Sequence, residues 1–295
     1  MAKKPVICIM YDFDKTLCTD DMQNFKFIPD LNMTPGEFWG KTGEFSDRTG
    51  VERILSYMYV MIEEGKKHGI EITKDYLKSC GESLIYYKGV EEWFDRINKF
   101  GAEHGFKIEH YVISSGLKEI IQGSKIFNKF TGVYACEYIY DNEGRASWPK
   151  LVINYTQKTQ FVFRISKGVK KISDDDKVNS RVKKEERHVL YKNMIYIGDG
   201  VTDIPCMQLI KDKGGNSIAV YKQSKIGATT EQLSTEERTN FVCKADYSEN
   251  SSLDMIVKTI ILNRETKQKL ETIDVKERKV ISKKAMKDKT EAENN

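Results

Sequence analysis

The chain has 295 residues, of which 39% are hydrophobic and 31% are charged, and its formal net charge at pH 7 is +4. These proportions are ordinary for a globular protein. No apolar run approaches the roughly 20 residues of a membrane span, and the N-terminus shows no cleavable signal peptide, so we expect a cytoplasmic protein with no membrane partner. The six cysteines are scattered without the spacing of a zinc site, which fits a reducing compartment.

Five short apolar runs with helical material between them predict the strands of a parallel sheet. Strands that are buried on both faces read as continuous apolar runs, and strand–helix alternation favours parallel pairing. We therefore expect an α/β fold with a Rossmann-like parallel sheet flanked by helices. The runs are residues 6–10, 108–113, 194–197, 217–220 and 241–242.

The segment between the first two runs predicts a helical insertion after the first strand. Apolar residues recur at helical spacing from Val51 to Ile62. Thr49 and Glu52 are expected to form a capping box at the start of that helix. A second helical patch follows at residues 73–84. We expect a core of residues 1–19 and 89–262, a helical cap of residues 20–88, and a charged tail of residues 263–295.

Two later segments show patterns that differ from the strand–helix alternation. Residues 133–153 predict a β-hairpin around a turn at 141–144. Residues 166–190 carry dense charges of both signs and predict an exposed excursion. The acidic triplet at 174–176 lacks a calcium-loop pattern, so solvated charge is favoured over a metal site.

Most of the net charge lies in the tail. Residues 264–295 hold ten Lys or Arg against seven Asp or Glu, which places +3 of the chain's +4 there. A mild excess of positive charge, in a stretch that also carries many negative charges, does not indicate a nucleic-acid-binding surface. We expect a solvated helix or a frayed end, and no nucleic-acid partner.

Two carboxylates follow the first apolar run, in the string Asp12-Phe13-Asp14-Lys15-Thr16. Because side chains alternate along a strand, Asp12 and Asp14 point the same way. Neighbouring carboxylates at the end of a buried strand need something that offsets their repulsion. A divalent metal, together with a nucleophile and an acid–base partner, would supply it.

Three further motifs bring polar groups to the ends of strands or helices. Ser114, Ser115 and Gly116 end the second run ahead of a helical stretch, and a hydroxyl at a helix start is a typical anion site. Lys158 begins an amphipathic stretch. Residues 198–203 (GDGVTD) end the third run, although taken alone the last aspartate could cap a helix and the first could sit in a plain turn.

In this order on one alternating α/β chain, the motifs resemble those of the haloacid dehalogenase-like (HAD) superfamily of phosphotransferases, within it the phosphoserine-phosphatase-like branch. The resemblance covers residues 5 to about 262, and the first and last motifs carry most of it. It implies a Mg²⁺-dependent phosphatase that hydrolyses a small phosphorylated metabolite through an aspartyl phosphate. It also implies that the helical insertion is a cap that selects the substrate.

The resemblance further implies a role for each motif residue. Asp12 would attack phosphorus, and Asp14 would protonate the leaving oxygen and then activate water. An acid at position 14 favours a phosphoester over a haloalkanoate, because a halide needs no proton. Mg²⁺ would be held by Asp12, Asp14 (through its carbonyl), Asp199 and Asp203 (through water), and the phosphoryl group by Thr16, Ser114, Ser115, Gly116 and Lys158.

Several alternatives stay open. Lys167 is a rival for the lysine role, because about forty residues separate Lys158 from Asp199, more than is usual in the family. We favour Lys158, which begins a helical pattern, whereas Lys167 ends one before Gly168. The alternative functions are a phosphatase for a protein or nucleic-acid end and a non-catalytic binding protein, and no oligomeric state is predicted. Cap candidates for substrate contact are Trp39, Glu44, Arg48, Arg53 and Tyr57.

Overall fold

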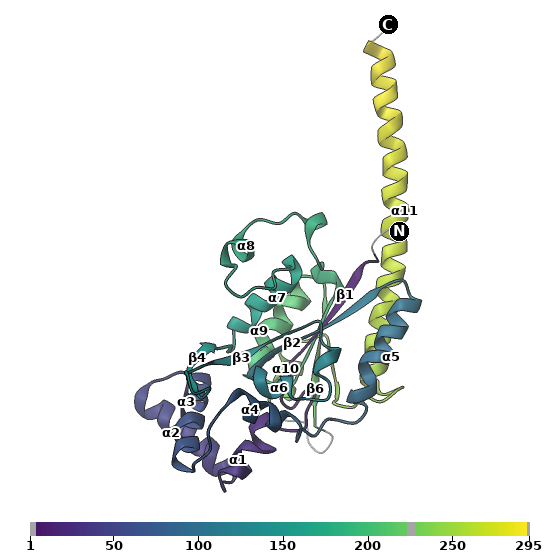
Figure 1. Cartoon of the computed structure of the whole chain (residues 1–295). Coiled ribbons are helices and arrows are strands. Elements are labelled where there is room, and N and C mark those ends of the chain that lie inside the picture. Colours follow the sequence, from purple (N-terminus) through teal and green to yellow (C-terminus); the bar gives the residue numbers. More distant parts are fainter. Residues whose placement is uncertain (1–3, 223–227, 294–295) are drawn as a thin grey trace.

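The computed structural model describes residues 4–222 and 228–293. Within these residues, seven strands form one sheet in the order β4-β3-β2-β1-β5-β6-β7 (Figure 1). Neighbouring strands are parallel except for the antiparallel pair β3–β4. This confirms the predicted parallel α/β sheet and the hairpin. The strands are β1 (Val6–Tyr11), β2 (Lys107–Leu117), β3 (Gly132–Tyr140), β4 (Ala146–Leu151), β5 (Met194–Gly198), β6 (Asn216–Tyr221) and β7 (Phe241–Lys244).

Helices flank the sheet on both sides. In Figure 1, α5 (Val90–Glu103) and α11 (Ser252–Glu293) lie on one side, and α7 (Gln157–Lys167) and α9 (Ile204–Asp212) on the other. Most of the charged tail continues α11 as a rod that extends from the body. No described helix has the length and apolar character that a membrane span needs. The remaining core helices are α6 (Lys118–Gln122), α8 (Asp175–Asn179) and α10 (Ala228–Thr235), with 3₁₀ turns η2 (Phe127–Lys129), η3 (Lys184–Glu186), η4 (Tyr191–Asn193) and η5 (Val201–Asp203).

The predicted helical insertion after β1 is confirmed, but the predicted capping box is wrong. α2 continues through Thr49 and turns at Gly50, whose φ is 71°. Glu52 is itself the N-cap of α3, because its carboxylate accepts hydrogen bonds from the first turn. The capping box lies one helix earlier, where Thr34 and Glu37 exchange hydrogen bonds. The insert comprises η1 (Met22–Asn24), α1 (Phe27–Asp30), α2 (Pro35–Thr49), α3 (Arg53–Lys67) and α4 (Lys74–Gly81).

The acidic triplet in the charged excursion takes part in ion pairs. Asp175 lies 2.7 Å from the guanidinium of Arg164, a buried side chain that also donates to two backbone carbonyls of the excursion. Asp174 pairs with Lys177 at 3.0 Å. Since two of the three carboxylates have a cation beside them, the triplet serves the local structure of the excursion.

Two glycines allow helix α4 of the insert to pack against helix α6 of the core. A Cβ atom on Gly81 would overlap the backbone carbonyl of Ile120, and one on Gly123 would overlap that of Lys78. Backbone atoms on both sides leave no flexible group that could move away. The contact between insert and core therefore requires glycine, which has no side chain, at both positions.

We predict that Gly81→Ala lowers the free energy of unfolding by about 1–3 kcal/mol, the usual cost of overpacking. The control is Gly43→Ala in α2, where a Cβ would meet no atom within 4 Å. That substitution should raise stability by about 0.5–1 kcal/mol, because alanine is the better helix former. Urea unfolding of both variants, followed by circular dichroism, measures the difference. Equal effects of the two substitutions would contradict the close-packing account.

Candidate active site

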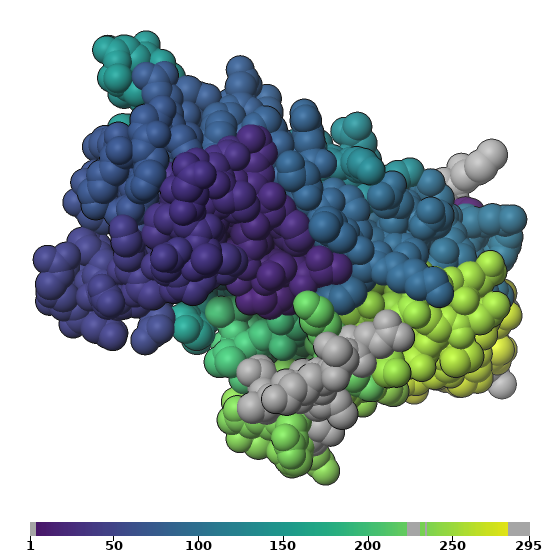
Figure 2. All heavy atoms as spheres, turned by 90° about the horizontal axis from the view of Figure 1, so that it is seen from below, coloured from purple at the N-terminus to yellow at the C-terminus, as the bar shows by residue number. Residues whose placement is uncertain are grey.

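The motif residues meet where the carboxyl ends of β1, β2 and β5 lie side by side. This is the edge of an open parallel sheet at which ligands bind. The backbone amide of Asp12 donates to the carbonyl of Ile197 at 2.9 Å, which holds the first motif against β5. In the view from below, the insert, in purple and blue, lies beside the green segment that follows β5 (Figure 2).

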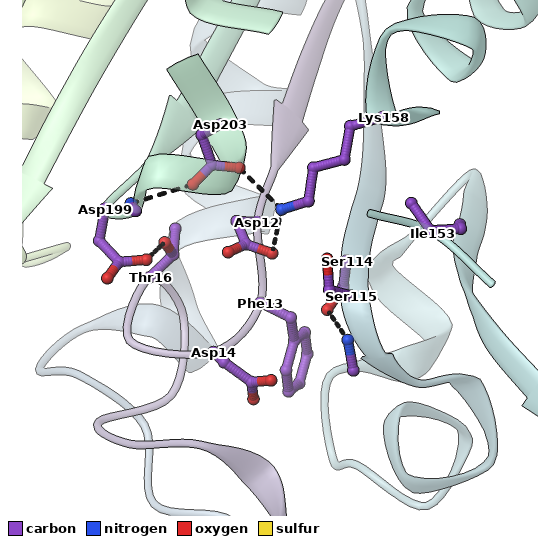
Figure 3. A network of polar contacts seen from close by, with 12 residues as sticks. Asp12, Phe13, Asp14, Thr16, Ser114, Ser115, Ile153, Lys158, Asp199 and Asp203 are labelled. Atoms are coloured by element: carbon purple, nitrogen blue, oxygen red, sulfur yellow. Dashed lines mark hydrogen bonds and ion pairs between the residues drawn. The ribbon is translucent and has the colours of Figure 1, made fainter. Parts of the chain in front are cut away.

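Lys158 connects two of the predicted aspartates. Its ammonium lies 3.1 Å from Asp12 and 2.8 Å from Asp203, and its side chain is fully buried (Figure 3). Burial alone would lower the pKa of Lys158, but the charges of Asp12 and Asp203 outweigh burial and raise that pKa above its usual value. The buried lysine therefore stays positively charged.

The rival lysine has a different environment. The ammonium of Lys167 donates to the backbone carbonyls of Val178 and Ser180, the latter at 2.7 Å. These bonds hold the charged excursion against the end of α7. The structure thus brings Lys158, and not Lys167, to Asp12.

Asp203 is fully buried and has hydrogen-bond donors at both carboxylate oxygens. One oxygen accepts from Lys158 and, at 2.7 Å, from the hydroxyl of Tyr196; the other accepts from the amide of Gly200 at 3.1 Å. This arrangement fixes the position of Lys158 and closes the turn after β5. From the sequence, Tyr196 was predicted only as part of a strand. The available signal was its position two residues before Gly198 in β5, which places both residues on the same side of the strand.

Asp199 lies next to Thr16 of the first motif. The Thr16 hydroxyl donates to Asp199 at 3.0 Å, and the Thr16 carbonyl accepts from the hydroxyl of Tyr247 at 2.9 Å. Thr16, predicted from the resemblance to bind phosphate, thus contacts a carboxylate in the structure. Carboxylate oxygens of Asp12, Asp199 and Asp203 lie within 4.8 Å of one another.

The electrostatics of this cluster fit a divalent cation. Burial, followed by the charge of Asp203, raises the pKa of Asp12 to about 6 despite the neighbouring Lys158. Burial and the charges of Asp12 and Asp203 also raise the pKa of Asp199. The buried carboxylates of Asp12 and Asp203 share the buried Lys158, and the half-buried Asp199 lies beside them. Carboxylate oxygens are the ligands that hard divalent cations prefer. The residues present therefore match a site of the magnesium type.

Asp14 lies near the cluster but outside it. Its carboxylate accepts from the amide of Met22 at 2.9 Å. Burial, and then the charges of Asp21 and Asp12, raise the pKa of Asp14 well above its usual value. Asp14 consequently holds a proton more readily than an exposed aspartate, which is the property of a general acid.

The serine motif lines the same pocket as the aspartates. Ser114, Ser115 and Gly116 border a cavity of about 260 Å³ together with Asp12, Asp14 and Asp199. The amide of Gly116 donates to the Ser114 hydroxyl at 2.9 Å. The insert supplies the other wall, from Gln23, Trp39, Ile54 and Tyr57.

Two of the five cap candidates from the sequence, Trp39 and Tyr57, line this pocket. Glu44 and Arg48 border a separate hollow between α2 and α3 of the insert. The side chain of Arg53 is 70% exposed, 3.9 Å from Asp47. Gln23 and Ile54 were missed, because nothing in their spacing distinguishes them from packing residues.

Comparisons with known proteins agree with this geometry. Residues 9–208 match the family model of haloacid dehalogenase-like hydrolases. A HAD family hydrolase of Salmonella enterica serovar Typhi has a similar fold, with 14% identity and a TM-score of 0.56 over 88% of this chain and 73% of that one. A phosphoserine phosphatase in the form of a phospho-aspartyl intermediate analogue is similar at 16% identity and a TM-score of 0.52, over 87% and 99% of the two chains.

A relative is also found by sequence. An uncharacterized protein of Borreliella burgdorferi is 27% identical over 280 residues, which cover 85% of this chain and 95% of that protein. The structural similarities, at their low identities, speak to the fold alone. The family model, by contrast, spans more than half of the sequence and includes the motifs that meet at the sheet edge. The chain belongs to the haloacid dehalogenase-like hydrolase family.

Proposed function

We propose that the protein is a Mg²⁺-dependent phosphatase that hydrolyses small phosphomonoesters through a phosphorylated Asp12. The observation that carries this proposal is the buried contact of Lys158 with Asp12, which lines the pocket, and with Asp203. This contact supports a nucleophilic role for Asp12, because the fixed ammonium of Lys158 orients the carboxylate and offsets part of its negative charge. A carboxylate that attacks an anionic phosphate requires both.

The proposed reaction uses Asp12 and Asp14 in two steps. A carboxylate oxygen of Asp12 attacks phosphorus as the bond to the leaving alcohol breaks, and Asp14 gives its proton to the leaving oxygen. Asp14 then takes a proton from the water that attacks the acyl phosphate, which releases inorganic phosphate and restores Asp12. The raised pKa of Asp14 supports the first step, because a protonated carboxyl group is needed there.

Asp12, Asp199 and the carbonyl of Asp14 would hold the cation directly, with Asp203 acting through water because its oxygens already accept hydrogen bonds. When bound, a divalent cation supplies positive charge against the repulsion between a carboxylate and a phosphate dianion. Lys158 supplies a second positive charge beside Asp12. Ser114 and Ser115 line the pocket, and we propose that their hydroxyls donate to the phosphoryl oxygens of a bound substrate.

The pocket favours a small substrate. Its volume of about 260 Å³ lies below the roughly 300–1,000 Å³ of sites for drug-sized ligands. Asp12 is only 7% exposed, and residues of the insert line the pocket that it faces. We therefore propose that residues 20–88 act as a cap on a core of residues 1–19 and 89–262, and that the cap restricts which phosphoesters reach Asp12.

We predict Mg²⁺-dependent hydrolysis of p-nitrophenyl phosphate that chelation with EDTA abolishes and fresh Mg²⁺ restores. Asp12→Asn should lower kcat by roughly 10⁴-fold or more, the scale of losing a nucleophile. Lys158→Ala should lower it by roughly 10²-fold or more, because the nucleophile loses its fixed cation.

The matched control is Lys167→Ala, whose ammonium bonds only to the charged excursion among the described residues. It should keep kcat within about twofold of the unmodified enzyme. Activity that survives Asp12→Asn would overturn the proposed nucleophile. A larger loss in Lys167→Ala than in Lys158→Ala would reverse the lysine assignment.

A second prediction concerns the metal without reference to activity. Asp199→Asn should weaken Mn²⁺ binding by roughly tenfold or more, because a carboxylate of the cluster is lost. Asp176→Asn, an exposed acidic residue of the excursion, is the control and should bind Mn²⁺ as the unmodified protein does. Titration followed by electron paramagnetic resonance measures both. Equal affinities in the two variants would refute the assigned site.

A further inference from the structure

A second cavity lies at the opposite end of the sheet from the candidate active site. It has a volume of about 690 Å³, within the roughly 300–1,000 Å³ of small-ligand sites. One wall is a face of α11, and the other includes Lys192, Asn216 and Phe241, which stand at or just before the amino ends of β5, β6 and β7. Among the described residues, this α11 cavity shares no lining residue with the pocket around Asp12.

The lining of the α11 cavity changes from apolar to cationic along the helix. Met255 and Ile260, on the first turns of α11, supply apolar lining together with Phe241 at the start of β7. Arg264 and Lys267 line the cavity on the turns that follow. Because a helix rises 1.5 Å per residue, Met255 and Lys267 lie about 18 Å apart along its axis. A ligand that fits both stretches has an apolar part and an anionic part.

The positive charge of the cavity exceeds its negative charge. Among the described lining residues, the cations are Lys192, Lys211, Arg264 and Lys267, and the one carboxylate is Glu271, a formal excess of +3. Glu271 pairs with both Lys192, at 2.6 Å, and Arg264, at 3.2 Å. Lys211 donates to a backbone carbonyl rather than to a carboxylate. This excess favours a ligand that carries more than one negative charge.

Arg264 gives the cationic stretch a fixed and largely buried donor. The residue is only 7% exposed, and one terminal nitrogen, Nη2, donates to Glu271. Nε is buried without a partner among the described residues, so the guanidinium charge is only partly compensated. Nη1 forms no hydrogen bond in the described part of the chain and is not one of its buried unpartnered atoms, so it keeps contact with solvent. An anion in the cavity that Arg264 lines would find this donor free.

The remaining lining favours a nucleobase over an alkyl chain. The ring of Phe241 is 39% exposed, and bases stack on aromatic rings. Three asparagines, Asn216, Asn240 and Asn263, also line the cavity. The side-chain oxygen of Asn240 accepts from the amide of Ser217 at 2.9 Å, which fixes the direction of its own amide. Side-chain amides hydrogen-bond to the edge of a base, and an alkyl chain would make no use of them.

We propose that the α11 cavity binds a nucleoside diphosphate or triphosphate. The base lies against Phe241 and Met255, and the phosphates lie toward Arg264 and Lys267. This second site goes beyond the proposed phosphatase function and does not rest on it, because the cavity lies at the other end of the sheet.

Calorimetric titration of the full chain with ADP, in EDTA, tests the site without reference to activity. Without a divalent cation, the carboxylates around Asp12 repel phosphate, which disfavours binding at the candidate active site. We expect ADP to bind about tenfold or more tightly than adenosine or pyrophosphate, because ADP alone occupies both stretches of the cavity. Asp199→Asn should leave the affinity for ADP unchanged. An affinity that changes in this variant would place ADP at the active site and overturn the proposal.

Two substitutions test the two stretches separately. Lys267→Glu should weaken the binding of both ADP and pyrophosphate by roughly tenfold, because it reverses a charge beside the phosphates. Its control is Lys276→Glu, an exposed lysine of α11 that does not line the cavity, which should change neither affinity by more than about twofold. Phe241→Ala should weaken ADP by roughly tenfold and leave pyrophosphate unchanged, because only the base stacks on the ring. Its control is Ile139→Ala, an exposed apolar residue of β3.

Three results would overturn the proposal. Pyrophosphate that binds as tightly as ADP would reveal a simple anion site, and dodecyl phosphate that binds more tightly than ADP would reveal a site for an amphiphile. No binding of ADP up to about 1 mM would show that the cavity holds no nucleotide. Circular dichroism confirms that each variant folds. If Lys267→Glu does not fold, Lys267→Ala takes its place, and unchanged affinity for ADP in the folded variant would contradict the assigned phosphate end.

Discussion

The site depends on one buried ion-pair network, in which Lys158 lies between Asp12 and Asp203. Burying three charged groups is costly, and such a network is retained only if each group is paired and hydrogen-bonded. Each member comes from a different element: the end of β1, the start of α7 and the turn η5 after β5. The network therefore holds together three segments that the sequence separates by more than 40 residues each.

The surroundings of the network make its chemistry possible. Tyr196 and the amide of Gly200 satisfy Asp203, so that its charge stays directed at Lys158. Gly198 is required because a side chain there would collide with the carboxylate of Asp203. Burial raises the pKa of both Asp12 and Asp14. Because burial disfavours the charged carboxylates, a nearby positive charge is needed to keep them ionised. This cluster would suit the divalent cation and the anionic phosphate of the proposed reaction.

The parts predicted from sequence are those that short patterns encode. Apolar runs located β1, β2, β5, β6 and β7, since strands buried on both faces leave an uninterrupted signal. The two aspartate motifs directly follow two of these strands, so parallel pairing alone brings them together. Lys158 was preferred over Lys167 as the lysine of the site because it begins a predicted helix.

Other features depend on contacts between distant residues, which no local pattern records. The Thr49–Glu52 capping box was wrong because α2 extends further than the local motif suggests, and Glu52 caps the next helix alone. Gln23 was missed because its place in the pocket wall is set by the way the insert folds onto the sheet. The contact of Thr16 with Asp199 joins residues 183 positions apart. These features could be identified only from the tertiary structure.

The central claim is that Asp12 becomes covalently phosphorylated, and the phosphorylated enzyme can be measured directly. In Asp14→Asn, p-nitrophenyl phosphate can still phosphorylate Asp12, because its leaving group needs no proton, but the acyl phosphate lacks its general base for hydrolysis. Mass spectrometry of the acid-quenched variant should show one added phosphoryl group, mapped to the peptide that contains Asp12. A phosphoryl group on any other residue, or continued turnover with no phosphorylated protein at all, would contradict the account.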